Sequence, residues 1–312
     1  MSARPTGSLQ ANGNCFAAML LWATGFVALE YLLDDWGVLS LSALRLAVSV
    51  AFLVLWWGWT EGWTKVFGAP WRKGVVIGGL GWGVGSVFLL MGQKLSDPVT
   101  VTIVVAMMPI AGATTEIVFD NRRLSWRLVV GIILAVLGGY LATGAQLTQG
   151  HFGFGVVLCL GAIFLFAWVT RATTRQLEPL SRTGQTAVTL SGGMLVTLAW
   201  CGISIVAGLG ETHIGTIDTG DWLPLFIVLL PSSGIAQLLW IRGAGKLGIL
   251  LASFHMNAVP FYVMVILVSL SLGQWHWLQA GAVALVALGV LVSQMSPGVF
   301  TQQRKTSQTR LD

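Results

Sequence analysis

Three polar side chains inside long apolar segments are the clearest candidates for binding a ligand. His255 and Asn257 stand just before Pro260 in "HMNAVPF", and Gln237 lies in another apolar run. Polar groups at membrane depth are costly and usually face the interior of a helix bundle. There they bond either to a neighbouring helix or to a bound molecule, and both interpretations stay open. Proline removes a backbone donor, so free carbonyls would also be available beside His255 and Asn257.

Tryptophan is the second conspicuous residue type, with 15 copies. Ten lie near the ends of apolar runs, where tryptophan commonly anchors a helix at the membrane interface: Trp36, Trp56, Trp57, Trp59, Trp63, Trp71, Trp126, Trp222, Trp275 and Trp277. Five lie deeper: Trp22, Trp82, Trp168, Trp200 and Trp240. Aromatic walls can hold an apolar or aromatic body by burial and ring packing. Packing or exposure to lipid remains the alternative for each of the five.

The glycine-rich stretch "GVVIGGLGWGVGS" contains Trp82 and Ser86. It lacks both G-x-G-x-x-G in a strand-to-helix setting and a terminal Lys-Ser/Thr, so it does not indicate phosphate binding. Two G-x-x-x-G pairs, Gly74/Gly78 and Gly81/Gly85, predict close packing against other helices instead. Trp82 and Ser86 could then face a cavity beside that smooth surface.

No constellation in the sequence predicts catalysis. Neither H-E-x-x-H nor G-x-S-x-G occurs, and the four histidines are scattered at 151, 213, 255 and 276. Cys15, Cys159 and Cys201 are single residues within apolar runs, which indicates neither a disulfide framework nor a metal site. We therefore expect no enzyme activity, no metal and no cofactor.

Composition places the chain in the membrane. Of its 312 residues 55% are hydrophobic and only 9% are charged, whereas soluble domains have about 25% charged residues. A helix needs about 20 apolar residues to cross the bilayer. Apolar runs of this kind occur ten times, near 13–33, 38–58, 74–93, 98–118, 126–144, 152–171, 184–208, 222–241, 247–270 and 278–296. The runs at 38–58 and 247–270 could be tilted or broken, and the first run is long enough to be retained rather than removed as a signal peptide.

Basic residues predict the orientation of these spans. Of the 17 Lys and Arg, 15 fall in alternate connecting segments or in the two termini, and the intervening segments carry Lys94 alone. Because Lys and Arg in short loops stay in the cytoplasm, both termini are expected there. The basic residues behind the net charge of +5 thus lie mostly in short loops and termini near lipid headgroups. We therefore expect no nucleic-acid partner.

A shift of 151 positions reveals a possible internal repeat. It aligns Gly92 with Gly243, Pro109 with Pro260 and Trp126 with Trp277, and also Leu134 with Leu285, Leu137 with Leu288 and Gly138 with Gly289. Two units of five spans would have opposite topologies, as in secondary transporters with a midplane substrate site. Pro109 and Pro260 would then mark equivalent bent helices that border the pathway and permit gating. Met107 and Met108, in "AMMPI", stand directly before the first of these breaks.

The stretch from Leu20 to Ser49, "LLWATGFVALEYLLDDWGVLSLSALRLAVS", resembles the opening of an EamA-type unit of the drug/metabolite transporter superfamily. The proline helix and the glycine-rich fifth span fit that resemblance. It covers about Asn14 to Ser296 and implies an all-α membrane protein of ten helices in two inverted five-helix repeats. Arg45 matches an Arg of the family pattern; a structural role and substrate contact stay open for it, as does snorkelling toward the interface. In the second half, "FAWVTRATTRQL" resembles the first-helix motif only through Trp168 and its spacing to Leu177.

The length and the Trp-rich, apolar character are most similar to the aromatic amino acid exporters of bacterial inner membranes. The resemblance implies repeats at 1–147 and 148–300, a cytoplasmic tail at 301–312, and export of aromatic and other apolar amino acids or similar small metabolites. The expected partners are that small-molecule substrate and the lipid bilayer, and we expect a monomer. The candidate substrate contacts are Trp22, Trp82, Ser86, Met107, Met108, Trp168, Gln237, Trp240, His255 and Asn257.

The energy source is the least constrained property. No Asp or Glu falls at the middle of an apolar run, whereas a proton antiporter generally places a carboxylate at the substrate site. We therefore expect facilitated transport. Proton-coupled drug or metabolite efflux through His255 or Glu30 is the alternative, and a membrane-embedded enzyme is a distant third.

Overall fold

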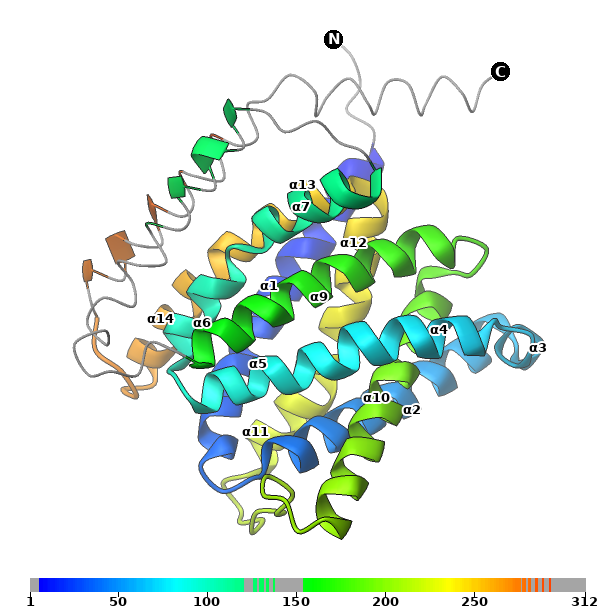
Figure 1. Ribbon diagram of the computed structural model, residues 1–312, viewed down its shortest axis with the longest axis horizontal. Helices are drawn as coiled ribbons and strands as arrows, with labels where there is room; N and C mark the ends of the chain where they lie inside the picture. The colour runs from blue at the N-terminus through cyan, green and yellow to red at the C-terminus, as the bar shows by residue number, and fades with distance from the viewer. Residues whose placement is uncertain are drawn as a thin grey trace.

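The computed structural model describes the backbone of residues 6–120 and 154–275, with individual residues between 126 and 137 and between 277 and 292. Its regular elements are helices (Figure 1). In chain order they are α1 (Thr6–Leu33), α2 (Val38–Glu61), α3 (Trp63–Phe67), α4 (Trp71–Gly78), η1 (Gly79–Val84), α5 (Gly85–Lys94), α6 (Pro98–Val105), α7 (Met108–Asp120), α9 (Phe154–Gln176), α10 (Arg182–Val206), α11 (Trp222–Ile227), η2 (Val228–Ile235), α12 (Ala236–Leu247), α13 (Ile249–Ser253), η3 (Phe254–Ala258) and α14 (Val259–Ser269).

Seven helical segments of the described chain are long and apolar enough to cross a membrane. They are Leu9–Leu33, Val38–Glu61, Trp71–Lys94, Thr100–Asp120, Phe154–Gln176, Arg182–Val206 and Trp222–Leu247. A helix satisfies its own backbone groups, which apolar lipid would leave unpaired. The chain is thus a multi-pass membrane protein. The spans expected at 126–144 and 278–296 fall where only scattered residues are described, and Gly138, Gly289 and the tail 301–312 lie outside the described residues. The count of ten spans and the inverted repeat therefore stay predictions.

Both predicted proline breaks interrupt a helix. A turn at Ala106 and Met107 separates α6 from α7, which holds Pro109 at its second residue. In the second half, the 3-10 segment η3 separates α13 from α14, which likewise has Pro260 at its second residue. Proline is tolerated in the first helical turn, where its missing N–H costs nothing. The run at 247–270 is therefore broken, whereas the run at 38–58 forms the continuous helix α2.

Two further interruptions were not predicted. The π-helical segment η1 separates α4 from α5, and η2 separates α11 from α12. Pro231 lies within η2, and serine hydroxyls pair with carbonyls of that segment: Ser233 donates to the Val228 oxygen and Ser49 of α2 donates to the Leu229 oxygen, both at 2.7 Å. Such bulges often occur at functional sites. Here both lie among the helices that surround the cavity described below.

The glycine pairs of the first half pack as predicted. A Cβ added at Gly78 would lie 1.6 Å from the Thr189 carbonyl oxygen of α10, and one at Gly74 would lie 2.0 Å from Val188. The second pair contacts α9, where Gly81 meets Val169 and Gly85 meets Phe166. The two G-x-x-x-G pairs thus allow α4, η1 and α5 to approach two different helices of the second half.

Helices of the two halves pack in matching pairs. In Figure 1, α1 lies along α12 and α5 lies along α9. A Cβ at Gly92 of α5 would lie 2.3 Å from Cys159 Sγ of α9, and a Cβ at Gly243 of α12 would lie 2.3 Å from Cys15 Sγ of α1. α2 also packs along α10. The glycines aligned by the 151-residue shift therefore serve equivalent contacts, which supports the predicted repeat.

Two of the tryptophans expected at the interface are buried instead. Trp57 is fully buried against Gly184 at the start of α10, and Trp36 is buried in the connection between α1 and α2. Exposed tryptophans agree with interfacial anchoring, as at Trp59, Trp126, Trp222 and Trp277. Position near a helix end does not distinguish the buried tryptophans from the exposed ones, because tertiary contacts with small residues decide which indole rings are covered.

Candidate functional site

A cavity lies among helices from both halves of the described chain. Its lining comes from α1, α2, η1, α5, α6, α7, α9, α10, η2, α12, η3 and α14. It comprises about 840 Å³ of space free of protein atoms, part of it continuous with the outside. It is therefore a partly open hollow bordered by both halves of the described chain.

Aromatic rings form two groups in the cavity lining. Trp22 and Trp240 have ring centroids 5.7 Å apart at 50°, and Trp82 and Phe166 have centroids 5.5 Å apart at 33°. Phe26 also lines the cavity. These rings come from α1, α12, η1 and α9. They offer a surface that suits an apolar or aromatic body.

Hydrogen bonds fix two of these indoles. Trp240 Nε1 donates to Thr170 Oγ1 of α9 at 3.0 Å, and Trp82 Nε1 donates to Thr189 Oγ1 of α10 at 3.3 Å. Both donors are thereby paired within the protein. The rings are held in place, and their apolar surfaces remain for the cavity.

The polar part of the lining comprises Arg45, Ser86, Ser232, Ser233 and Gln237. Ser232 and Ser233 lie in η2, and Gln237 follows one helical turn after Ser233. The Ser233 hydroxyl donates a hydrogen bond to the Val228 carbonyl oxygen, whereas Gln237 Nε2 is buried with no hydrogen-bond partner in the described chain. The cavity thus combines aromatic surface with a group of hydrogen-bond donors.

Six of the ten predicted contact residues line the cavity: Trp22, Trp82, Ser86, Met108, Gln237 and Trp240. Trp168 is not among its lining residues, because it lies two positions from Phe166 and so about 200° around α9. The break before Pro109 similarly places Met108, not Met107, on the cavity.

His255 and Asn257 do not line the cavity either, although Met256 between them does. His255 Nδ1 lies 3.1 Å from the Ala252 carbonyl oxygen within its own helical turn. Asn257 Oδ1 is buried with no partner in the described chain. The sequence correctly indicated that polar groups precede the break, but it did not indicate which face of η3 they occupy.

Neither predicted gating proline lines the cavity, but their neighbours do. Met108 and Val259 each precede a proline and contribute to the lining. The breaks therefore border the cavity, as expected, while the proline rings lie away from it. A gating role for Pro109 and Pro260 stays a prediction.

Several lining residues were missed or left undecided by the sequence. For Arg45 the sequence leaves both a structural role and substrate contact open, and it does not single out Phe166, Ser232 or Ser233. The signal for the serines was the proline between apolar residues in "LLPSSG", which resembles the two other proline breaks. Phe166 carried no distinctive signal among the 14 phenylalanines.

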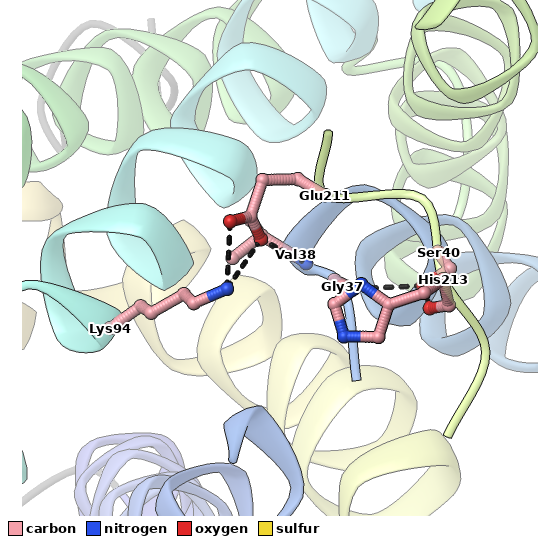
Figure 2. Close-up of polar contacts among 6 residues, drawn as sticks. All are labelled: Gly37, Val38, Ser40, Lys94, Glu211 and His213. Carbon is pink, nitrogen blue, oxygen red and sulfur yellow. Dashed lines mark hydrogen bonds and ion pairs between the residues drawn. The ribbon is translucent and has the colours of Figure 1, made fainter. Parts of the chain in front are cut away.

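At one end of the bundle, the loop between α10 and α11 closes over the start of α2 (Figure 2). Gly37, the N-cap residue of α2, offers no side chain to the first N–H groups. Glu211 replaces a local cap: its Oε2 accepts from the Val38 N–H at 3.1 Å, and its carbonyl oxygen accepts from the Leu39 N–H at 2.9 Å. A negative charge at this position also interacts favourably with the helix dipole.

The same carboxylate pairs with Lys94 at the end of α5, at 2.7 and 2.8 Å. We refer to Lys94, Glu211 and Val38 as the Glu211 clasp. Partial burial raises the pKa of Glu211, but the Lys94 ammonium and the Val38 N–H offset it, so this pKa lies below its ordinary value. The loop is secured further by the Gly37 N–H and the Ser40 hydroxyl, which both donate to the His213 carbonyl oxygen.

The opposite end of the bundle carries most of the described basic residues. Arg171 pairs with Asp120, and Lys73 Nζ donates to the Gln176 carbonyl oxygen at 3.1 Å. Arg182 donates to Gln185 Oε1 at 2.8 Å and to the Gly245 carbonyl oxygen at 3.1 Å. The Arg171 and Lys73 contacts join helices of the two halves, at the end that the charge pattern predicts to be cytoplasmic.

Together, the apolar helices and a cavity lined by aromatic and polar side chains describe a multi-pass membrane protein with a candidate small-molecule site. Residues 11–144 match the model of the EamA-like transporter family. The matched segment covers less than half of the chain, and it is this segment that is similar to the family. A solved structure titled "Crystal structure of protein" is similar over 92% of this chain and 97% of its own, with a TM-score of 0.69 and 20% identity. At that identity the likeness shows the fold alone. The comparison with curated proteins found no match.

Proposed function

We propose that this protein is a transporter that exports aromatic and other apolar amino acids, or similar small metabolites, from the bacterial cytoplasm across the inner membrane. The observation that carries the proposal is the cavity, which combines aromatic walls with a polar group at membrane depth. The EamA match over residues 11–144 supports transport rather than catalysis. A similar solved fold spans nearly the whole chain, and we extend the proposal to the second half on that likeness of fold alone.

Alternating access is the proposed mechanism. Matched packing of α1 with α12 and of α5 with α9 supports two inverted repeats, at 1–147 and 148–300, with the cavity between them. Interruptions at α6/α7, η1, η2 and η3 provide places where helices can bend. Rocking of these helices would expose the cavity first to one side of the membrane and then to the other.

Facilitated, gradient-following movement is proposed for the energetics. Among the described residues that line the cavity there is no Asp, Glu or His that could exchange a proton with the substrate. Glu30 lies near the end of α1, accepts a hydrogen bond from Gln93 Nε2 at 3.1 Å, and does not line the cavity. These observations favour facilitated transport over proton antiport.

Flux into liposomes containing the purified protein tests both parts of the proposal. Radiolabelled L-phenylalanine, L-tryptophan and L-leucine should enter faster than L-aspartate and L-lysine, and protein-free liposomes serve as the control. An imposed pH gradient should not drive accumulation above equilibrium. Absence of flux for all the apolar amino acids would contradict the substrate class, and uphill accumulation abolished by a protonophore would establish the proton-coupled alternative.

A further inference from the structure

Arg45 is a buried cation in the cavity wall, and no described residue pairs with its Nε. Its side chain lies in α2 with only 8% of the residue exposed. Arg45 follows the first residue of α2, Val38, by seven positions, which is about 10 Å along the helix axis. Its Nε has no hydrogen-bond partner in the described chain. A buried charge is costly unless it is paired and hydrogen-bonded.

Snorkelling toward lipid headgroups does not fit this placement. A snorkelling arginine extends its charged end outward to the interface, whereas Arg45 is covered by protein and lines the cavity. A purely structural role does not fit either. Arg182 shows what such a role involves, because its guanidinium donates to both Gln185 and Gly245 of neighbouring segments.

The acidic residues of the chain are placed elsewhere. Of the 12 Asp and Glu, only Asp312 lies outside the described residues. None of the described acidic residues lines the cavity, and none forms an ion pair with Arg45. The described lining thus carries one charged side chain, and that side chain is positive.

The polar neighbours in the cavity are also rich in donors. Gln237 Nε2 is buried and unpaired in the described chain, and the hydroxyls of Ser86 and Ser232 lie in the same lining. A carboxylate accepts hydrogen bonds through both oxygens and matches the planar fork of a guanidinium. An ammonium group would find no countercharge among these residues.

We propose that Arg45 binds the carboxylate of the transported molecule, and that the cavity selects apolar carboxylates without requiring an amino group. This inference rests on the proposed transport function and specifies the chemical group that the site recognises. The aromatic rings contact the apolar body, Arg45 pairs with the carboxylate, and Gln237 supplies a further donor. The amino group of an amino acid is accommodated but contributes no ion pair.

Binding to the purified protein in nanodiscs tests the inference with three matched probes: 3-phenylpropionate, its neutral isostere 3-phenylpropionamide, and L-phenylalanine. Calorimetric titration should show that the carboxylate binds at least about tenfold more tightly than the amide, as expected for a charge-assisted pair. L-Phenylalanine should bind no more than about threefold more tightly than 3-phenylpropionate. An amide that binds as tightly as the carboxylate, or an amino acid preferred by about tenfold or more, would overturn the inference.

Variants of Arg45 separate substrate binding from a structural role. Arg45→Gln should abolish the preference for carboxylate over amide, and Arg45→Lys should retain part of it. Arg45→Met should raise the melting temperature of the ligand-free protein, because it removes an unpaired buried charge. The control Arg182→Gln should lower the melting temperature and leave the preference unchanged. Retention of the preference by Arg45→Gln, or a lower melting temperature for ligand-free Arg45→Met, would contradict the assigned role.

The two proposals fail in different ways. If 3-phenylpropionate binds through Arg45 but L-phenylalanine is not transported, the proposed substrate range is wrong and the role of Arg45 stands. If L-phenylalanine is transported and the amide binds as tightly as the carboxylate, transport stands and the role of Arg45 is wrong.

Discussion

Replacing Glu211 by Gln should loosen the end of the bundle that the charge pattern predicts to lie outside the cell. The substitution removes the ion pair with Lys94 and the negative charge at the start of α2 but keeps an oxygen that can accept from the Val38 N–H. The Lys94 and Glu211 side chains are each about 30% exposed, so solvent screens the pair. A partly exposed pair contributes about 0.2–1 kcal/mol, and a charge at a helix N-terminus about 0.3–1 kcal/mol.

The combined loss of about 0.5–2 kcal/mol corresponds to a roughly two- to thirtyfold larger population in which the Glu211 clasp is open. A cysteine introduced at Ser232, with Cys15, Cys159 and Cys201 replaced by Ala, reports this opening. In intact cells the Glu211→Gln variant should react faster with an impermeant thiol reagent by that factor. Lys94→Met should have a similar effect, and the double variant should add little to either.

Glu61→Gln is the matched control, because Glu61 pairs with Lys65 at 3.7 Å near the opposite end of α2. It should leave the labelling rate unchanged. Equal labelling of the Glu211→Gln protein and its parent, or full additivity of the two clasp substitutions, would refute the prediction that the Glu211 clasp limits access of the reagent to position 232.

Lowering the pH should weaken the Glu211 clasp. Because the pKa of Glu211 is lowered in the folded protein, its charged form contributes stability above its ordinary value of 4.5, and this contribution is lost as pH falls below that value. The difference in melting temperature between the unmodified protein and Glu211→Gln should therefore shrink below about pH 4.5. A difference that grows on acidification would contradict the sign of the shift.

Two further predictions concern packing and topology. In α10, Gly192→Ala should destabilise the purified protein by about 1–3 kcal/mol or more in thermal unfolding, because the added Cβ would lie 2.3 Å from the Val75 carbonyl oxygen. The control Gly202→Ala should not destabilise it, since a Cβ there meets no atom within 4 Å. Equal effects of the two substitutions would contradict the close approach of α10 to α4. A single cysteine at Asp218 should react with an impermeant thiol reagent in intact cells, and one at Lys65 should not, because the two positions lie at opposite ends of the bundle. The reverse pattern would contradict the orientation predicted from the basic residues.

The sequence was sufficient for the membrane class and for most helices, because apolar length alone requires a helix in lipid. It also located both proline breaks and the glycine pairs, since these depend on local chemistry. It could not determine helical phase around the breaks, and it therefore included Met107, His255 and Asn257, which do not line the cavity.

Contacts made over long sequence distances were also beyond prediction from the sequence. Glu211 caps a helix that begins 173 positions earlier in the chain, and Trp57 is covered by a glycine of α10. Both π-helical segments contribute residues to the cavity lining, and in η2 serine hydroxyls pair with the carbonyls of Val228 and Leu229. No local pattern encodes these partners.

The most direct test of the account compares transport by variants on and off the cavity. Trp22→Ala and Gln237→Ala alter its lining, whereas Trp168→Ala and His255→Ala change similar residue types that do not line it. In proteoliposomes with equal amounts of folded protein, the first two should reduce L-phenylalanine counterflow by at least about tenfold, as expected when contact residues are truncated. The last two should remain within about twofold of the unmodified protein. Normal counterflow by both cavity variants, together with loss in Trp168→Ala or His255→Ala, would contradict the assignment of this cavity as the substrate site.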